Sequence, residues 1–356
     1  MKSIAEIICV ILSTFPYYAP TLKEEDVKSK KLCGNSNQLY LVTLPSSYPN
    51  NTFLVRYFGK LGDLIDTRIE RNVFIALCKM DFGLKQYKLT NEYRVEQYIA
   101  SVPFSGIELK NSISIMSFAK KICQFHHSNE LSDILKSSKF QKPYHEVIFD
   151  DWVEIITNKK KEIISSLKTN LEKNTLAELF EILSSKQYIE QKLLCKDLCA
   201  GSIVNSHNDI HCCNLLMHQD KTVSILDFEY TSRNYMAMDV GSYASESCTD
   251  CSLTEYPFYA HREEARLSND EIMLLCCEYK KEEYKIMKPT IPEADYIIDQ
   301  ANLLYKQVIS IIPLINLYWA LWCMMMMDWN NISEANIVLA STKLQVYKEL
   351  VKAQTA

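Results

Sequence analysis

The stretch Val204–Met217 reads VNSHNDIHCCNLLM, and Val223–Glu229 reads VSILDFE. Together they give the spacing H-N-D-x-x-x-x-N, followed by an apolar run that ends in D-F-E, with Asp227 thirteen residues after Asn214. A short apolar run of this kind predicts a buried strand. Because the strand ends at Asp227, it can bring that carboxylate next to the loop that holds Asp209 and Asn214.

This spacing suits the transfer of a phosphoryl group from ATP. The reaction needs a carboxylate to orient the attacking hydroxyl and accept its proton, and oxygen ligands to hold Mg²⁺ on the phosphates. We predict that Asp209 has the first role and that Asn214 and Asp227 are the metal ligands, since Mg²⁺ prefers hard oxygen donors. Adding D-F-E to the loop pattern makes a polar loop with mere capping residues the weaker interpretation.

Thiols and imidazoles crowd the same stretch and raise the alternative of a zinc site. Residues 207–218 contain three histidines and two cysteines, and residues 248–251 form an isolated C-x-x-C. Their spacings match no common zinc pattern. The chain has 13 cysteines, an odd number, scattered along its length. We therefore predict reduced, mostly buried thiols in a cytosolic protein rather than a disulfide scaffold.

The composition is that of a soluble globular protein of one or two domains. The 356 residues are 47% hydrophobic and 23% charged, and the net charge of −5 makes nucleic acid an unlikely partner. Glu6 interrupts the apolar stretch Ile4–Leu12, which predicts a short amphipathic helix rather than a signal peptide. Val308–Met327 contains Pro313 and Asn316, and we interpret it as a buried helix rather than a membrane span, so no membrane insertion is expected.

The order of predicted elements is strand, strand, helix, strand, strand, and then mainly helix. Residues 39–44, 52–58, 85–90 and 93–99 favour strands, and residues 66–79 have helical spacing. From residue 112 onward the chain favours helices, apart from a β patch at 214–228, and we expect a hinge near 97–104. The order predicts a two-lobed, protein-kinase-like α+β fold, with a small antiparallel-sheet lobe at residues 1–100 and a larger, mainly helical lobe at 101–356.

The positions after D-F-E carry a second signature. Asn234, Asp239 and Glu246 follow Asp227 by seven, twelve and nineteen residues. Residues 256–259 read YPFY, and residues 318–322 read YWALW, a W-x-x-W helix. In these positions the sequence resembles the choline/ethanolamine kinases, which share the protein-kinase-like fold with the aminoglycoside phosphotransferases.

The resemblance implies ATP and Mg²⁺ as cofactors and a small amino alcohol as acceptor. Choline is slightly preferred over ethanolamine as our expectation, and the product would enter the route to phospholipids in the cytoplasm. The resemblance also implies that Glu246, Trp319 and Trp322 receive the ammonium group, and a tryptophan face attracts such a cation. A homodimer is common in the family, and the sequence leaves it open.

The N-terminal lobe matches the family more weakly. Residues 33–37 read CGNSN and resemble a G-G-x-S-N phosphate loop that has lost its first glycine. Glu70 resembles the glutamate that pairs with a phosphate-binding arginine, here Arg56. His211 stands where choline kinases have glutamine. The residues that the resemblance assigns to the nucleotide are Gly34, Ser36, Asn37, Arg56, Glu70, Gln97, His211 and Asp227.

Several departures from the family pattern keep alternatives open. Ala244, Cys251 and, on a loose alignment, Leu339 replace aromatic residues of the choline cage, which leaves an ethanolamine-specific kinase or a relaxed preference open. Cys33 in the phosphate loop supports a non-catalytic binding module of the same fold. Another small-molecule kinase, acting on aminoglycosides or methylated sugars, fits the second signature less well. After the H-N-D loop the chain has D-F-E where protein kinases have D-F-G, and the A-P-E and G-x-G-x-x-G elements are missing, which excludes that class. The D-F-G at residues 81–83 precedes that loop and is not at the kinase position.

Overall fold

The computed structural model describes residues 2–32, 37–59, 66–80, 82–100, 105–250, 253, 255–257, 259–325 and 334–355. The chain forms two compact units, Met1–Ala100 and Ser101–Ala356. The first is built on a sheet and the second mostly on helices, which confirms the α+β class.

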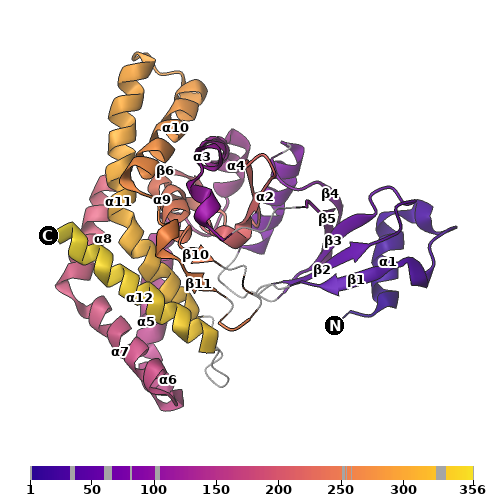
Figure 1. Ribbon diagram of the computed structural model, residues 1–356, viewed down its shortest axis with the longest axis horizontal. Helices are drawn as coiled ribbons and strands as arrows, with labels where there is room; N and C mark the ends of the chain where they lie inside the picture. Colours follow the sequence, from indigo (N-terminus) through magenta and orange to yellow (C-terminus); the bar gives the residue numbers. More distant parts are fainter. Residues whose placement is uncertain are drawn as a thin grey trace. The chain divides into compact units, whose positions relative to one another are not determined.

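The N-terminal unit contains a five-stranded antiparallel sheet with the strand order β1-β2-β3-β5-β4 (Figure 1). The predicted pairs of strands are present, but β1 was missed, because its sequence KSKK has no apolar alternation. Lysines of this kind are common on edge strands, where they discourage pairing with another chain. The elements are α1 (Ile4–Thr14), β1 (Lys28–Lys31), β2 (Gln38–Thr43), β3 (Thr52–Tyr57), α2 (Thr67–Lys79), β4 (Gln86–Leu89) and β5 (Tyr93–Gln97).

The apolar core of this unit joins α1 to one face of the sheet. Ser3 and Glu6 begin α1 with a capping box, which confirms the predicted N-terminal helix. Its buried residues Ile7 and Ile11 belong to one cluster with Val55 and Val95 of the central strands. Side chains alternate along a strand, so Arg94 and Glu96 point to the opposite face from Val95. Arg94 there stacks on Phe74 of α2, with 3.4 Å between the guanidinium carbon and the ring centroid.

The C-terminal unit is helical around short two-stranded sheets. Its helices are α3 (Ser112–His126), α4 (Asn129–Leu135), α5 (Tyr144–Asn158), α6 (Lys160–Ser166), α7 (Asn170–Ser184), α8 (Lys186–Cys199), α9 (Met236–Glu246), α10 (Asn269–Met287), α11 (Glu293–Met325) and α12 (Glu334–Thr355). Its strands are β6 (Ile203–Ser206), β7 (Leu215–Met217), β8 (Val223–Ile225), β9 (Ser232–Tyr235), β10 (Thr249–Asp250) and β11 (Ala260–His261), paired as β6–β9, β7–β8 and β10–β11.

The long helix α11 is the centre of this unit and packs against α8, α9, α10 and α12 (Figure 1). It is long and apolar enough to cross a membrane, but most of its apolar stretch is buried inside the protein, as predicted for a core helix. Gly241 lets α9 approach it closely. A Cβ at Gly241 would lie 2.9 Å from the Ile315 side chain and 3.1 Å from that of Ile311.

Candidate active site

The β7–β8 hairpin brings the predicted metal ligands together. Leu215 pairs with Ile225, and the Leu226 amide donates to the Asn214 carbonyl oxygen at 2.8 Å. Asp227 follows directly, in a left-handed conformation with φ 59°. This conformation is uncommon outside glycine and is often found at functional sites. The hairpin therefore places Asp227 beside Asn214, as the sequence spacing predicts.

Asp209 lies on the loop between β6 and β7, half-buried, and contacts Asn214. The Asn214 side-chain nitrogen donates to the Asp209 carbonyl oxygen at 2.9 Å and to its Oδ2 at 2.7 Å. Because the nitrogen end of the amide is used in this way, its oxygen is the end left for a metal ion. Asp209 and Asn214 are thus in direct contact, and the Leu226–Asn214 hydrogen bond brings the backbone just before Asp227 next to Asn214. Amide and carboxylate oxygens of this kind are the ligands that Mg²⁺ prefers.

A buried carboxylate at the start of α9 fixes the backbone of this loop. Asp239 accepts hydrogen bonds from the His207 amide at 2.6 Å and the Asn208 amide at 2.8 Å. Asn208 has a positive φ of 68°, which asparagine tolerates better than most residues. Burial raises the pKa of Asp239, but the hydrogen bonds from His126 and His207 outweigh it, and the pKa is lowered overall. Asp239 is therefore a charged anchor for the residues just before Asp209.

Two histidines connect this anchor to the rest of the fold. Burial lowers the pKa of His126, although the Asp239 carboxylate beside it acts in the opposite direction. The His126 ring donates from Nε2 to Asp239 at 3.0 Å and accepts from the Tyr279 hydroxyl at 2.9 Å. His207 donates from Nε2 to the Leu226 carbonyl at 2.8 Å and accepts from the Asp209 amide at 3.2 Å. His207 thereby joins the Asp209 loop to the strand that carries Asp227.

A second chain of hydrogen bonds supports Asn208 from the other side. Asn234 donates to the Asn208 side-chain oxygen at 2.6 Å, and His145 of α5 donates to Asn234 at 2.7 Å. Asn208 also donates to the Tyr230 carbonyl at 2.9 Å. The signature asparagine at position 234 is thus a support for the loop.

His211 is close to both Asp209 and the tryptophan pair. Its Nε2 lies 3.6 Å from Asp209 Oδ1. Its ring packs edge-on against the Trp319 ring, with 5.6 Å between the two ring centroids. Desolvation lowers the pKa of His211, but the Asp209 carboxylate outweighs it and the pKa is raised well above its usual value. The ligand atoms of His211, Cys212 and Cys213 also lie within 4.8 Å of one another, so the described residues keep this group as a possible soft-metal cluster.

The two tryptophans of α11 form a partly exposed aromatic wall. Their ring centroids are 5.7 Å apart, and both side chains are half-buried. Trp322 donates from Nε1 to the Tyr230 hydroxyl at 3.5 Å. Since Tyr230 follows the D-F-E run, this contact brings the tryptophan wall close to the Asp209 loop.

Glu246, the predicted acceptor of the substrate's ammonium group, has a partner from its own chain. Lys343 donates to both carboxylate oxygens of Glu246, at 2.7 and 2.8 Å. Glu246 and Lys343 are each 3% exposed. The Glu246 carboxylate therefore already has a cationic partner in its own chain, and its contact with the substrate stays a prediction.

The predicted nucleotide residues of the N-terminal unit are joined differently from the expected pair. Glu70 accepts from Arg94 at 2.8 Å, Arg94 donates to Glu96 at 2.9 Å, and Glu96 accepts from Arg56 at 3.2 Å. Glu70 is therefore linked to Arg56 through two further residues. The strand register accounts for this arrangement, because Arg56 on β3 lies directly opposite Arg94 on β5. The two adjacent guanidinium groups are balanced by the carboxylates of Glu96 and Glu70.

The remaining predicted residues lie at loops and strand ends. The Asn37 side-chain oxygen accepts from the Gly59 amide at 3.0 Å. Gln97 lies at the end of β5, and its side-chain oxygen accepts from the Lys85 backbone amide at 3.3 Å. The backbone amide of Gln97 donates to the Lys85 carbonyl oxygen at 2.8 Å. Gly34 and Ser36, together with Cys33 and Cys251, lie outside the described residues.

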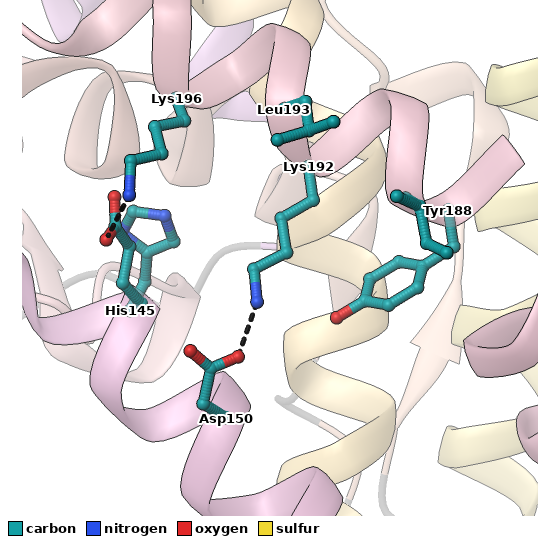
Figure 2. Close-up of a pocket in the computed structure, with 8 residues that line it drawn as sticks. His145, Asp150, Tyr188, Lys192, Leu193 and Lys196 are labelled. Atoms are coloured by element: carbon teal, nitrogen blue, oxygen red, sulfur yellow. Dashed lines mark hydrogen bonds and ion pairs between the residues drawn. The ribbon is translucent and has the colours of Figure 1, made fainter. Parts of the chain in front are cut away.

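A separate pocket of about 330 Å³ lies between α5 and α8 (Figure 2). Its lysines are bound to acids of α5, since Lys192 donates to Asp150 and Lys196 donates to Glu146 at 3.3 Å. His145 lines the same pocket and is the residue that supports Asn234. The pocket therefore borders the supports of the Asp209 loop.

Comparison with known proteins identifies the class. The family model for choline/ethanolamine kinase matches residues 29–348, so the chain belongs to the choline/ethanolamine kinase family, a family of kinases. A rat choline/ethanolamine kinase is 24% identical over 324 residues, which cover 88% of this chain and 77% of the relative.

Two solved structures confirm the kinase-like fold. A choline kinase from Cryptosporidium parvum superposes with a TM-score of 0.71 at 20% identity, covering 99% of this chain and 96% of the other. An ethanolamine kinase from Plasmodium vivax gives a TM-score of 0.69 at 18% identity, covering 95% of this chain and 86% of the other. At these identities the likeness concerns the fold.

Proposed function

We propose that this protein transfers the γ-phosphate of ATP to the hydroxyl group of choline or ethanolamine, with choline as the preferred acceptor. The observation that carries the proposal is the hydrogen bonding of Asn214 to Asp209, together with the β7–β8 hairpin, which ends directly before the Leu226–Asp227 step. The family assignment supports the choice of acceptor. The product would be a phospho-amino alcohol for phospholipid synthesis, and we place the enzyme in the cytoplasm.

In this proposal Asp209 orients the attacking hydroxyl and takes its proton as the new O–P bond forms, while the bond between the γ-phosphorus and the bridging oxygen breaks and ADP leaves. The Asn214 amide holds the Asp209 carboxylate in place, and Asp239 holds the backbone before it. His211 beside Asp209 adds positive charge near the phosphates. The chain's own contribution is thus a fixed, correctly directed carboxylate.

The oxygen cluster fits Mg²⁺, the ion that such kinases use with ATP. Asn214 would offer its amide oxygen and Asp227 its carboxylate, both hard donors. When bound, Mg²⁺ neutralises the phosphate charge that builds up during transfer. A zinc site, which the sequence spacing disfavours, would instead use the neighbouring thiols of Cys212 and Cys213, and the two donor sets differ in chemistry.

We assign nucleotide binding to the N-terminal unit at residues 1–100, and acceptor binding and catalysis to residues 101–356. Arg56, held by Glu96, suits a phosphate contact because its guanidinium has a fixed direction. Gln97 ends a strand with polar groups that adenine can use. Gly34, Ser36, Asn37 and Glu70 complete the proposed nucleotide residues. Trp319 and Trp322 offer aromatic faces to the ammonium group.

The test is release of ADP from Mg-ATP with choline or ethanolamine at matched concentrations. Turnover with choline supports the proposal as stated. Turnover with ethanolamine but not with choline would mean that the protein is an ethanolamine-specific kinase, whose cage with fewer aromatic residues suits the smaller ammonium group. Activity with neither amino alcohol contradicts the proposal and favours another acceptor or a non-catalytic module.

A further inference from the structure

The loop that carries Asp209 also holds a group of soft ligands whose thiols the proposed reaction does not use. His211, Cys212 and Cys213 are consecutive, and their ligand atoms lie close together. The proposed phosphoryl transfer depends on oxygen donors and gives neither thiol a task. Thiolate and imidazole are the ligands that thiophilic cations such as Zn²⁺ prefer. A second kind of ion therefore fits beside the proposed Mg²⁺ donors.

A single turn of backbone explains how three consecutive residues converge. His211 is extended, with φ −153° and ψ 171°, and Cys212–Asn214 then forms one turn of 3₁₀ helix. The Cys213 backbone amide donates to His211 Nδ1 at 3.3 Å, so the imidazole folds back over this turn. The ring also exchanges side-chain hydrogen bonds with both thiols. Structural zinc motifs space their cysteines by a few residues, so a site of adjacent ligands matches none of those patterns.

The group is open to solvent on one side and mostly buried on the other. Cys213 is exposed, whereas Cys212 is buried. An ion can therefore enter past Cys213 and be held partly away from water by Cys212. The Cys212 thiol donates to the Thr249 carbonyl at 2.9 Å, and this bond ends when the thiol gives up its proton to a metal ion. Three protein ligands leave a fourth position open, whereas structural zinc sites are closed by four. We therefore expect reversible binding.

Small side-chain rotations are enough to close the site around an ion. Two ligand atoms on one tetrahedral zinc ion lie about 3.5–3.8 Å apart, since Zn–S is about 2.3 Å and Zn–N about 2.0 Å. The ligand atoms of this group already lie within 4.8 Å of one another, so they have to approach by roughly 1 Å. The exposed side chain of Cys213 is free of the packing that would oppose such a rotation.

The other ring nitrogen of His211 connects the group to the proposed base. His211 Nε2 lies 3.6 Å from Asp209 Oδ1. A histidine that binds a metal ion through one nitrogen usually donates its other N–H to a carboxylate. With an ion on Nδ1, the Nε2–H group points to Asp209 and is a stronger donor than in the free ring. The Asp209 carboxylate is then held by the ring and is not available to the acceptor hydroxyl.

We propose that His211, Cys212 and Cys213 form an inhibitory site for a thiophilic divalent cation such as Zn²⁺. The bound ion holds the Asp209 carboxylate through the His211 ring and so stops phosphoryl transfer. Each thiol that coordinates releases one proton to the solvent, and no electron is transferred. The site stands on the turn and its ligands, while the inhibition rests on the proposed kinase activity and deepens it by adding a regulator of the same loop.

Metal binding is tested first, on the full chain, reduced and then freed of reductant, without substrate. The probe is Co²⁺, because thiolate coordination gives this ion a charge-transfer absorption band. Cys277→Ser is the matched control for Cys213→Ser, since Cys276 and Cys277 are also adjacent and the second thiol is again the more accessible one. We expect the band in the wild type and in Cys277→Ser, and an affinity lower by at least about tenfold in Cys213→Ser. No band in the wild type, or equal affinity in Cys213→Ser, would overturn the site.

Inhibition is tested by ADP release from Mg-ATP and the amino alcohol at increasing free Zn²⁺, with each protein compared with its own zinc-free rate. We expect equal inhibition of the wild type and Cys277→Ser, recovery with a zinc-selective chelator, and a requirement for at least about tenfold more Zn²⁺ in Cys213→Ser.

Two results of this assay would overturn the proposal. Equal inhibition of all three proteins would place the zinc ion at the oxygen donors, and cobalt binding without zinc inhibition would separate the site from the reaction. Absence of turnover before zinc is added would contradict the proposed function instead. The cobalt titration needs no turnover, so it decides the metal site in that case too.

Discussion

Asn214 and Asp209 are joined by two hydrogen bonds from one side-chain amide, at 2.9 Å to the Asp209 carbonyl and 2.7 Å to its carboxylate. One side chain thus fixes both the backbone and the direction of the proposed base. The same amide uses its nitrogen for both bonds, which leaves its oxygen for the proposed metal ion. The proposed base Asp209 and the proposed metal ligand Asn214 therefore hold each other in position, and we expect a substitution of either residue to displace the other.

Asp239→Asn tests the anchor of the loop. One of the two oxygens that accept from the His207 and Asn208 amides becomes an NH₂ group, which cannot accept. We expect a loss of about 3 kcal/mol in the free energy of unfolding, and a fall in kcat larger than any change in KM. Urea unfolding and steady-state kinetics measure the two effects. Asp133→Asn, at an exposed surface pair, is the control and should change neither. An equal response of both variants would argue against the anchor.

Arg94→Met tests the ion chain of the N-terminal unit. The change leaves Glu70 and Glu96 without the cation that joins them, and Glu96 is 1% exposed. We expect a cost of about 3–5 kcal/mol in stability, seen as an earlier thermal transition. Arg71→Met, on helix α2 next to Glu70, removes a cation that among the described residues is bound to the exposed Asn91, and should cost far less. Similar thermal transition temperatures for Arg94→Met and Arg71→Met would contradict the proposed importance of the Glu70–Arg94–Glu96 ion pairs.

Glu283→Gln tests a buried charge by its pH dependence. Burial alone would raise the pKa of Glu283, but its bonds to His127, Lys280 and Tyr296 lower it from 4.5 to about 2. The folded-state pKa is depressed, so the stabilisation is complete above pH 4.5 and is lost as the pH falls toward 2. Above pH 4.5, we expect the free energy of unfolding of the wild type to exceed that of the variant by on the order of 3 kcal/mol.

That stability difference should shrink as the pH falls through the window, measured by urea unfolding at each pH. Glu278→Gln, on the same helix α10, removes a weaker pair with Lys281 and serves as the control. A difference that stays constant with pH would mean that Glu283 does not titrate as the contacts require.

Trp322→Ala tests the aromatic wall. Removing a tryptophan face next to a partly desolvated ammonium group should raise the KM for the amino alcohol by about tenfold. The KM for ATP should stay the same. Trp322→Phe keeps an aromatic face and should recover part of the loss. If Trp322→Ala leaves the KM for the amino alcohol unchanged, the pair is part of the core and not of the acceptor site.

Local sequence patterns predicted most of the fold. The β patch at 214–228, the strands of the first unit and the buried helix α11 each follow from the spacing of apolar residues. The pair β6–β9 was missed because each strand has four residues, too few for a clear alternation, and because they are far apart in the sequence. β1 was missed because its residues are mostly charged.

The partners of charged residues could not be predicted in the same way. Lys343 is 97 residues from Glu246, and nothing local to either residue indicates the pair. Arg94 and Glu96 became visible only with the strand register, which also explains why Glu70 does not pair directly with Arg56. Asp239 was noted as a signature residue, but its role as acceptor for the backbone amides before Asp209 could be recognised only in the folded structure. Its early position in α9 was the available signal, because a helix N-terminus favours an acidic side chain.

The most direct test of the account follows the phosphoryl group itself. Wild-type protein and Asp209→Asn are incubated with Mg-ATP and choline or ethanolamine, the phosphorylated amino alcohol is measured by ³¹P NMR, and ATP binding is measured by calorimetry. The account predicts product from wild type, a loss of at least about 100-fold in the variant, and nearly equal ATP affinity in both. Near-normal product formation by Asp209→Asn would contradict the assignment of the base, and no product from wild type would contradict the proposed reaction.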